Sequence, residues 1–205
     1  RVGAGSYFWK GTPKTRAILV NNPNNPTGTV YTEEILRGLV DLAVKHDLYI
    51  ISDEIYEKLI YNGKKFIAVA SLSKEAWEHT ITINGLSKAY AMTGFRIGFA
   101  CASREIIEAM TKIHSFSMMC APIVSQVAAT EALRAQKEML EMRMEYKRRR
   151  DFIVKELNRI GLITPKPQGA FYCFSSVKNF KISSLEFARR LLFEEKVALV
   201  PGNAF

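Results

Sequence analysis

Three short apolar runs that end in polar residues place the strongest constraint on the fold of this chain. They cover residues 17–20, 48–51 and 80–84, and each is too short for a typical helix. Continuous apolar runs of this length are typical of strands that are covered on both faces. Between the first two runs, Thr32 is a good N-cap for an amphipathic helix that ends near Asp47. This order predicts right-handed crossovers and a mainly parallel α/β sheet flanked by helices.

Residues 96–101 offer a further strand, and helices follow it. One helix is expected from Ser103 onward and a second after Pro122. A long helix over about 136–160, ended by Gly161 at its C′ position, is long enough to connect two domains.

The pattern changes again past this long helix. We expect strands at 171–175 and from 198, and a capping box formed by Ser183 and Glu186 opens another helix. The predicted organisation has three parts: residues 1–135 as part of a large α/β domain, 136–160 as a connecting helix, and 161–205 as part of a smaller α+β domain.

Chemically active side chains follow the strands of the predicted sheet. Asn25, Asp53 and Lys88 each come after an apolar run, and ligands of parallel α/β sheets bind beyond these carboxyl ends. Lys88 lies among small residues, and Arg96 follows eight positions later. A deprotonated lysine amine forms a Schiff base with an aldehyde, and an arginine binds phosphate. The segment therefore suits a carbonyl cofactor with an anionic tail.

Composition disfavours several other functions. The 205 residues carry a net charge of +9, but the basic residues between 134 and 159 are interleaved with acidic ones. That mixing indicates a solvated helix face rather than a nucleic-acid site. The three cysteines and three histidines are scattered, which predicts no disulfide framework and no metal. No apolar run is long enough for a membrane span, so no membrane partner is expected.

The motifs together resemble the class I and II aminotransferases, which have the pyridoxal-phosphate fold type I. The resemblance rests on segments 25–28, 52–56 and 87–98, with further landmarks at 169–172 and 200–202. Whole members of this family are about twice as long, so the resemblance implies an internal fragment. In the family plan the glycine-rich phosphate loop, the ring stacked on the cofactor and the carboxylate-binding arginine fall outside it.

The resemblance implies roles for individual residues. Lys88 would form the Schiff base with pyridoxal 5′-phosphate and also act as the base that moves the substrate Cα proton. Asp53 would bind the pyridine nitrogen and keep it protonated. Tyr56 and Asn25 would donate hydrogen bonds to the phenolate oxygen of the ring.

The phosphate contacts and one backbone feature also follow from the resemblance. Arg96 would bind the phosphate, with Ser87 supplying a hydroxyl to it or packing under the ring. Gly85 stands where many members carry a phosphate-binding serine. By the same analogy, the Asn25–Pro26 peptide bond is expected to be cis.

The implied function is transfer of an amino group from an aspartate-like or aromatic amino acid to a 2-oxo acid. A C–S lyase on the same fold would share every residue named above. A non-catalytic regulator is a third interpretation, which the intact Lys88 and Asp53 argue against. The resemblance further implies a homodimer located in the cytoplasm.

Overall fold

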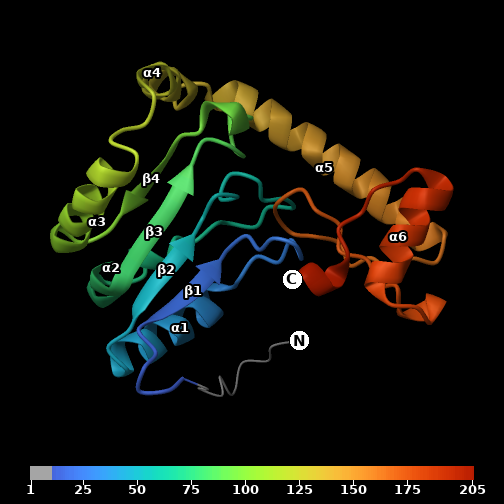
Figure 1. Ribbon diagram of the computed structural model, residues 1–205, viewed down its shortest axis with the longest axis horizontal. Helices are drawn as coiled ribbons and strands as arrows, with labels where there is room; N and C mark the ends of the chain where they lie inside the picture. Colours follow the sequence, from blue (N-terminus) through green and yellow to red (C-terminus); the bar gives the residue numbers. More distant parts are fainter. Residues whose placement is uncertain (1–10) are drawn as a thin grey trace.

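A mixed sheet organises the part of the chain that the computed structural model describes, residues 11–205 (Figure 1). Its strands are β1 (Ala17–Asn21), β2 (Tyr49–Asp53), β3 (Thr80–Gly85) and β4 (Gly98–Cys101), and they lie in that order. The first three run parallel, while β4 pairs antiparallel with β3. The predicted mainly parallel α/β class is therefore confirmed.

Helical connections carry the chain between the parallel strands. The helix α1 (Glu33–Lys45) joins β1 to β2, and the Thr32 side chain caps it as predicted. A short helix that the sequence did not predict, α2 (Lys74–His79), precedes β3 and is capped by Ser73. Six residues are too few to show a helical apolar period, which explains why α2 was missed.

The main core lies where α1 and α2 pack against the sheet. It consists of buried side chains from the strands, the helices and the turn before α2: Val20, Leu36, Val40, Ala43, Leu48, Ile50, Val69 and Ala76. Leu36 and Ile50 are fully buried. The opposite face of β1 is open, since 73% of Leu19 is exposed. The expectation of strands covered on both faces is thus not met, because no segment within residues 11–205 covers Leu19.

Three further helices follow β4. These are α3 (Arg104–Ser117), α4 (Ile123–Ala132) and α5 (Gln136–Arg159). The start of α3 after Ser103 and of α4 after Pro122 agrees with the sequence prediction. The long helix α5 ends one residue before the predicted limit, and Gly161 adopts a positive φ of 88° just beyond it. In Figure 1, α5 extends from the region of α4 to that of α6.

The last helix, α6 (Ser184–Glu195), begins where the capping pattern predicts. The Ser183 hydroxyl accepts a hydrogen bond from the Glu186 amide at 3.1 Å. The strands predicted at 171–175 and from 198 were wrong, since both segments are irregular in the structure. An extended segment becomes a strand only with a hydrogen-bonded neighbour, and no described segment forms a ladder with either of them.

Short 3₁₀ turns complete the described chain: η1 (Val69–Ser71), η2 (Thr93–Phe95), η3 (Lys178–Phe180) and η4 (Gly202–Ala204).

Two loops interlock beside the carboxyl ends of the strands. The Gly28 carbonyl accepts hydrogen bonds from the amides of Gln168 and Gly169, at 2.8 and 2.9 Å. Gly28 has a φ of +67°, and a Cβ atom there would overlap Pro167 Cβ. A Cβ atom on Gly169 would lie 2.7 Å from Pro23 Cβ. Glycine is therefore required at both positions for the loops to approach this closely.

We expect Gly28→Ala to destabilise the protein more than Gly63→Ala. Both glycines have positive φ, +67° and +70°, but a Cβ atom on Gly63 would meet nothing within 4 Å. Each change carries the backbone strain of about 1 kcal/mol, and overpacking adds about 1–3 kcal/mol at Gly28 only. Urea unfolding of both variants measures the difference. Equal losses would show that the two loops separate at no cost.

Candidate functional site

The carboxyl ends of the three parallel strands meet at one edge of the sheet. Asn21 at the end of β1 is in register with Asp53 at the end of β2. The Glu54 amide donates to the Ile83 carbonyl at 2.9 Å, which joins the end of β2 to β3. The polar residues that follow these strands are therefore brought together, as the sequence predicts.

Tyr56 lies at the centre of this edge and is only 3% exposed. Its hydroxyl lies 2.6 Å from that of Tyr172. Burial, and then the contact with Tyr172, hold the pKa of Tyr56 well above its usual range. The negative charge of Asp53 acts in the same direction, while the Asn25 side chain lowers the pKa. The phenol therefore remains protonated and is available as a hydrogen-bond donor.

Asn25 and Asp53 are fixed by local contacts. The Asn25 amide nitrogen donates to Asn21 Oδ1 at 2.6 Å, and the Asn25 side chain is exposed. The Asn25–Pro26 bond is cis, as predicted, and the Asn22–Pro23 bond is cis as well. Asp53 Oδ1 accepts a hydrogen bond from the Ile55 amide at 3.2 Å.

Lys88 follows β3 by three residues and is half-buried. Its Nζ atom lies 5.8 Å from the centroid of the Phe171 ring. That ring meets the Tyr56 ring edge-on, with centroids 5.5 Å apart. Phe171 also stacks on Tyr146 of α5 at 5.2 Å. Phe171 and Tyr146 thus form an aromatic wall. The Lys88 amine and the Tyr56 ring both contact this wall at Phe171.

The residues expected to bind phosphate lie on the connection from β3 to β4. Ser87 is half-buried next to Lys88. Arg96 is exposed, has a left-handed backbone with a φ of 52°, and donates from Nη1 to the Thr93 carbonyl at 2.8 Å. A Cβ atom on Gly85 would lie 3.0 Å from Gly98 Cα, so glycine permits the close approach of β3 and β4. The structure thus groups Asn25, Asp53, Tyr56 and Lys88, and turns Arg96 toward its own loop.

Sequence reasoning did not single out Glu54, which is buried beneath the site. The Ser52 hydroxyl donates to Glu54 Oε1 at 2.9 Å, and the Val69 amide donates to it at 3.3 Å. Burial is the main reason that the pKa of Glu54 is raised to about 7. The alternation of a strand places Ser52 and Glu54 on the face opposite Asp53, a signal that could have identified them as core residues.

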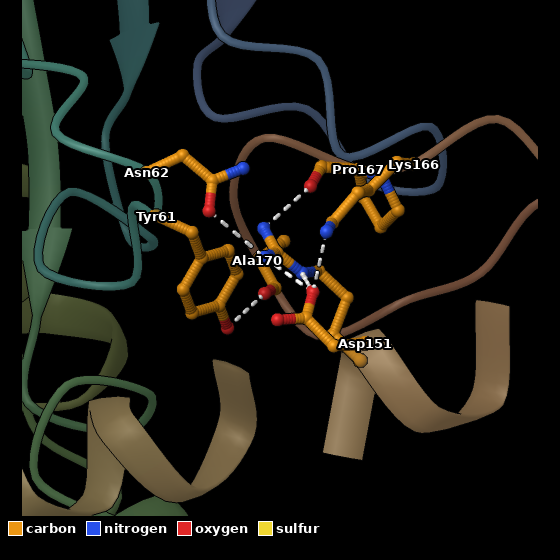
Figure 2. A network of polar contacts seen from close by, with 7 residues as sticks. Tyr61, Asn62, Asp151, Lys166, Pro167 and Ala170 are labelled. Carbon is orange, nitrogen blue, oxygen red and sulfur yellow. Dashed lines mark hydrogen bonds and ion pairs between the residues drawn. The ribbon is translucent and has the colours of Figure 1, made fainter. Parts of the chain in front are cut away.

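Arg150 of α5 anchors the loop that carries the aromatic wall, and three of its partners, Asn62, Asp151 and Pro167, are labelled in Figure 2. It is 5% exposed, and its Nη1 and Nη2 atoms donate to the Pro167 carbonyl at 3.0 Å and to Asn62 Oδ1 at 3.1 Å. Its guanidinium lies 4.5 Å from the centroid of the Tyr61 ring and pairs with Asp151 at 2.7 Å. The predicted solvated face fits residues 147–149, which are exposed, but it was wrong for Arg150.

Two further contacts complete this network (Figure 2). Lys166 Nζ pairs with Asp151 Oδ1 at 2.8 Å, and the Tyr61 hydroxyl donates to the Ala170 carbonyl at 2.6 Å. The loop is thereby fixed on both sides just before Phe171 and Tyr172. Helical periodicity alone did not reveal it, because the partners of Arg150 come from distant loops.

A cavity of about 480 Å³ lies between α5 and residues 171–173. Phe171 and Tyr172 line it, but Lys88, Asp53 and Tyr56 do not. The two rings therefore separate this cavity from the polar residues at the strand ends.

Two other kinds of site are absent from the part of the chain that the structure describes. Residues 11–205 contain no group of three or more His, Cys, Asp or Glu side chains arranged to hold a metal ion. Within the same range, none of the helices combines the length and the apolar character that crossing a membrane requires.

We expect Arg150→Ala to lower the free energy of unfolding by about 2–3 kcal/mol, because it leaves the buried Pro167 carbonyl without its donor and removes the contacts with Asn62 and the Tyr61 ring. Arg149→Ala is the matched control, since Arg149 is exposed and pairs only with Glu145 on the same helix face. That change should cost less than about 1 kcal/mol. Chemical denaturation of both variants tests this, and similar losses would contradict an anchoring role for Arg150.

We expect Glu54→Gln to flatten the dependence of stability on pH. The folded-state pKa of about 7 exceeds the ordinary glutamate pKa of 4.5, so the folded protein binds this proton more tightly than the unfolded chain. The resulting stabilisation is complete below about pH 4.5 and is lost as the pH rises through 7, by about 3 kcal/mol in total. Urea unfolding between pH 5 and pH 8 measures this slope. An unchanged slope in the variant would rule out Glu54 as its source.

The sequence is similar to a known protein family and to characterised relatives. Residues 8–205 match the family described as aminotransferase class I and II. The chain is 47% identical over 197 residues to aromatic-amino-acid aminotransferase 2 of Thermococcus litoralis, covering 95% of this chain and 50% of that protein. It is 48% identical to an aspartate aminotransferase of Pyrococcus abyssi, with the same coverage.

Solved structures give the same result. The crystal structure of an aromatic aminotransferase from Pyrococcus horikoshii OT3 superposes with a TM-score of 0.92 at 45% identity, covering 95% of this chain and 53% of that one. The chain spans about half the length of the curated relatives that it matches. The resemblance seen in the sequence motifs is confirmed, and the chain belongs to the class I and II aminotransferase family.

Proposed function

We propose that the protein is a pyridoxal-phosphate-dependent aminotransferase that moves an amino group from an aspartate-like or aromatic amino acid to a 2-oxo acid. The convergence of the Lys88 amine and the Tyr56 phenol on the Phe171 ring carries this proposal, because it brings a nucleophile and a hydrogen-bond donor to one site. The names of the relatives from Thermococcus litoralis and Pyrococcus abyssi support the two substrate classes.

The donor set at the strand ends fits pyridoxal 5′-phosphate. Lys88 offers a primary amine for the aldehyde, and the carboxylate of Asp53 suits a protonated ring nitrogen. Tyr56 and Asn25 offer donors for the ring oxygen. Ser87 and Arg96 lie on the connection that would face the phosphate. The bond from Arg96 Nη1 to the Thr93 carbonyl leaves other guanidinium N–H groups available to it. When bound, this cofactor supplies an electron sink that weakens the bonds at the amino acid Cα atom.

The side chains of this protein would each have a separate role in the proposed reaction. Lys88 Nζ would hold the cofactor, and as a free amine it would take the proton from the amino acid Cα atom as a general base and give up a proton as a general acid. Asp53 stabilises positive charge on the ring nitrogen by its own negative charge. Tyr56 and Asn25 hold the ring oxygen and orient it relative to Lys88.

The wider organisation is proposed on the same basis. We infer that residues 1–135 belong to a large domain, 136–160 to a connecting helix and 161–205 to a small domain, since α5 spans the distance between the sheet region and α6 (Figure 1). A cytoplasmic homodimer is the proposed assembly. Exposed apolar side chains from the end of α3 into α4, such as Phe116 at 88% exposure, support an interface there.

An assay of the intact protein tests the proposed reaction. With an aspartate-like or aromatic donor and 2-oxoglutarate, we expect glutamate to form together with the 2-oxo acid of the donor. Release of ammonia and pyruvate from a sulfur-containing amino acid, without glutamate, would instead indicate a C–S lyase.

We expect Lys88→Ala to abolish the visible absorbance of the bound cofactor and to lower turnover at least about 10²-fold, because it removes both the attachment point and the base. Lys74→Ala is the control, as Lys74 is exposed on α2 and pairs only with Glu78. Absorption spectra and the glutamate assay measure both effects. Retention of colour and turnover by the Lys88 variant would refute the mechanism.

A further inference from the structure

We propose that Tyr172 is a positioning residue of the site, which directs the hydroxyl proton of Tyr56 toward the ligand. This inference rests on the proposed function and adds to it a residue from the segment after α5. It starts from the short contact between the two hydroxyl oxygens, at 2.6 Å.

The contact joins two hydroxyl groups that each carry one proton. Either oxygen can be the donor, so only one of the two protons lies between them. If Tyr56 donates to Tyr172, its own proton is not available to a ligand. If Tyr172 donates, the Tyr56 proton is free to point elsewhere. The orientation of this pair therefore decides what Tyr56 can do.

The groups that face Tyr56 favour the second arrangement once a ligand oxygen is present. Burial raises the pKa of Tyr56 most, Tyr172 and Asp53 raise it further, and Asn25 lowers it. A protonated Tyr56 would donate a hydrogen bond to an anionic ring oxygen. Tyr172 then becomes the donor to Tyr56, and hydrogen bonds in such a chain strengthen one another. Lys88, on the same aromatic wall through Phe171, adds a primary amine to the site.

Tyr172 is held in this place by the chain on its N-terminal side. The Ala170 amide donates to the Leu59 carbonyl at 2.9 Å, and the Ala170 carbonyl accepts from Tyr61 at 2.6 Å. Phe171 packs between Tyr146 and Tyr56. The Tyr172 ring meets the Tyr56 ring at 5.8 Å with an interplanar angle of 79°. The backbone bonds of Ala170 and the ring contacts of Phe171 and Tyr172 therefore hold the Tyr172 hydroxyl next to that of Tyr56.

A double-mutant cycle in the intact protein tests the inference. The variants are Tyr56→Phe, Tyr172→Phe and the double variant, and the first readout is the Kd for pyridoxal 5′-phosphate by absorbance titration of the cofactor-free protein. We expect Tyr172→Phe to weaken binding about 3- to 10-fold, the effect of one hydrogen bond. In the Tyr56→Phe background the same change should have no further effect, because Tyr172 acts through Tyr56.

The second readout needs no cofactor. We expect each single variant to lower the thermal unfolding midpoint of the cofactor-free protein by about 2–4 °C, and the double variant to lower it no further than the single ones. Tyr49→Phe serves as the control, since Tyr49 is exposed on β2, and it should change neither the Kd nor the midpoint.

The outcomes separate the inference from the proposed function. Additive shifts in the unfolding midpoint would overturn the role of Tyr172. So would a Kd that rises equally in both backgrounds, or a Kd that does not change in either. A wild-type protein that fails to bind pyridoxal 5′-phosphate would count against the proposed function. The unfolding cycle would still decide whether Tyr172 and Tyr56 act as one unit.

Discussion

The Gly28 carbonyl oxygen accepts hydrogen bonds from two consecutive amides of a loop about 140 positions away, and the arrangement of the site depends on this contact. It fixes the loop after α5 against the turn that follows β1. Two residues further along, Phe171 forms the aromatic wall for Lys88, and Tyr172 meets Tyr56. The absence of a side chain at Gly28 and Gly169 is what allows the two backbones to come this close.

Two consecutive acidic residues at the end of β2, Asp53 and Glu54, lie in different surroundings. Asp53 lies on the side of the site, where it faces Tyr56. Glu54 points into the core, where burial favours its neutral form and two donors hold it in place. A buried carboxyl group thus directly follows the end of β2, next to the carboxylate that we propose as a cofactor ligand.

Much of this arrangement follows from local sequence, whereas the long-range contacts do not. Apolar runs and caps such as Thr32 and Ser183 located the parallel strands, α1 and α6, because these signals act within a few residues. The strands expected at 171–175 and from 198 failed, because pairing depends on partners that propensity cannot reveal. The predicted solvated position was wrong for Arg150, because its partners Pro167 and Asn62 are far away in the sequence.

The central claim is that Lys88 is the point at which the cofactor is attached. Its most direct test is reduction of the intact, cofactor-loaded protein with borohydride, followed by proteolysis and peptide mass analysis. The account predicts a phosphopyridoxyl group on the peptide that contains Lys88 and on no other lysine. An unmodified Lys88, or a stable label on a different lysine, would contradict it.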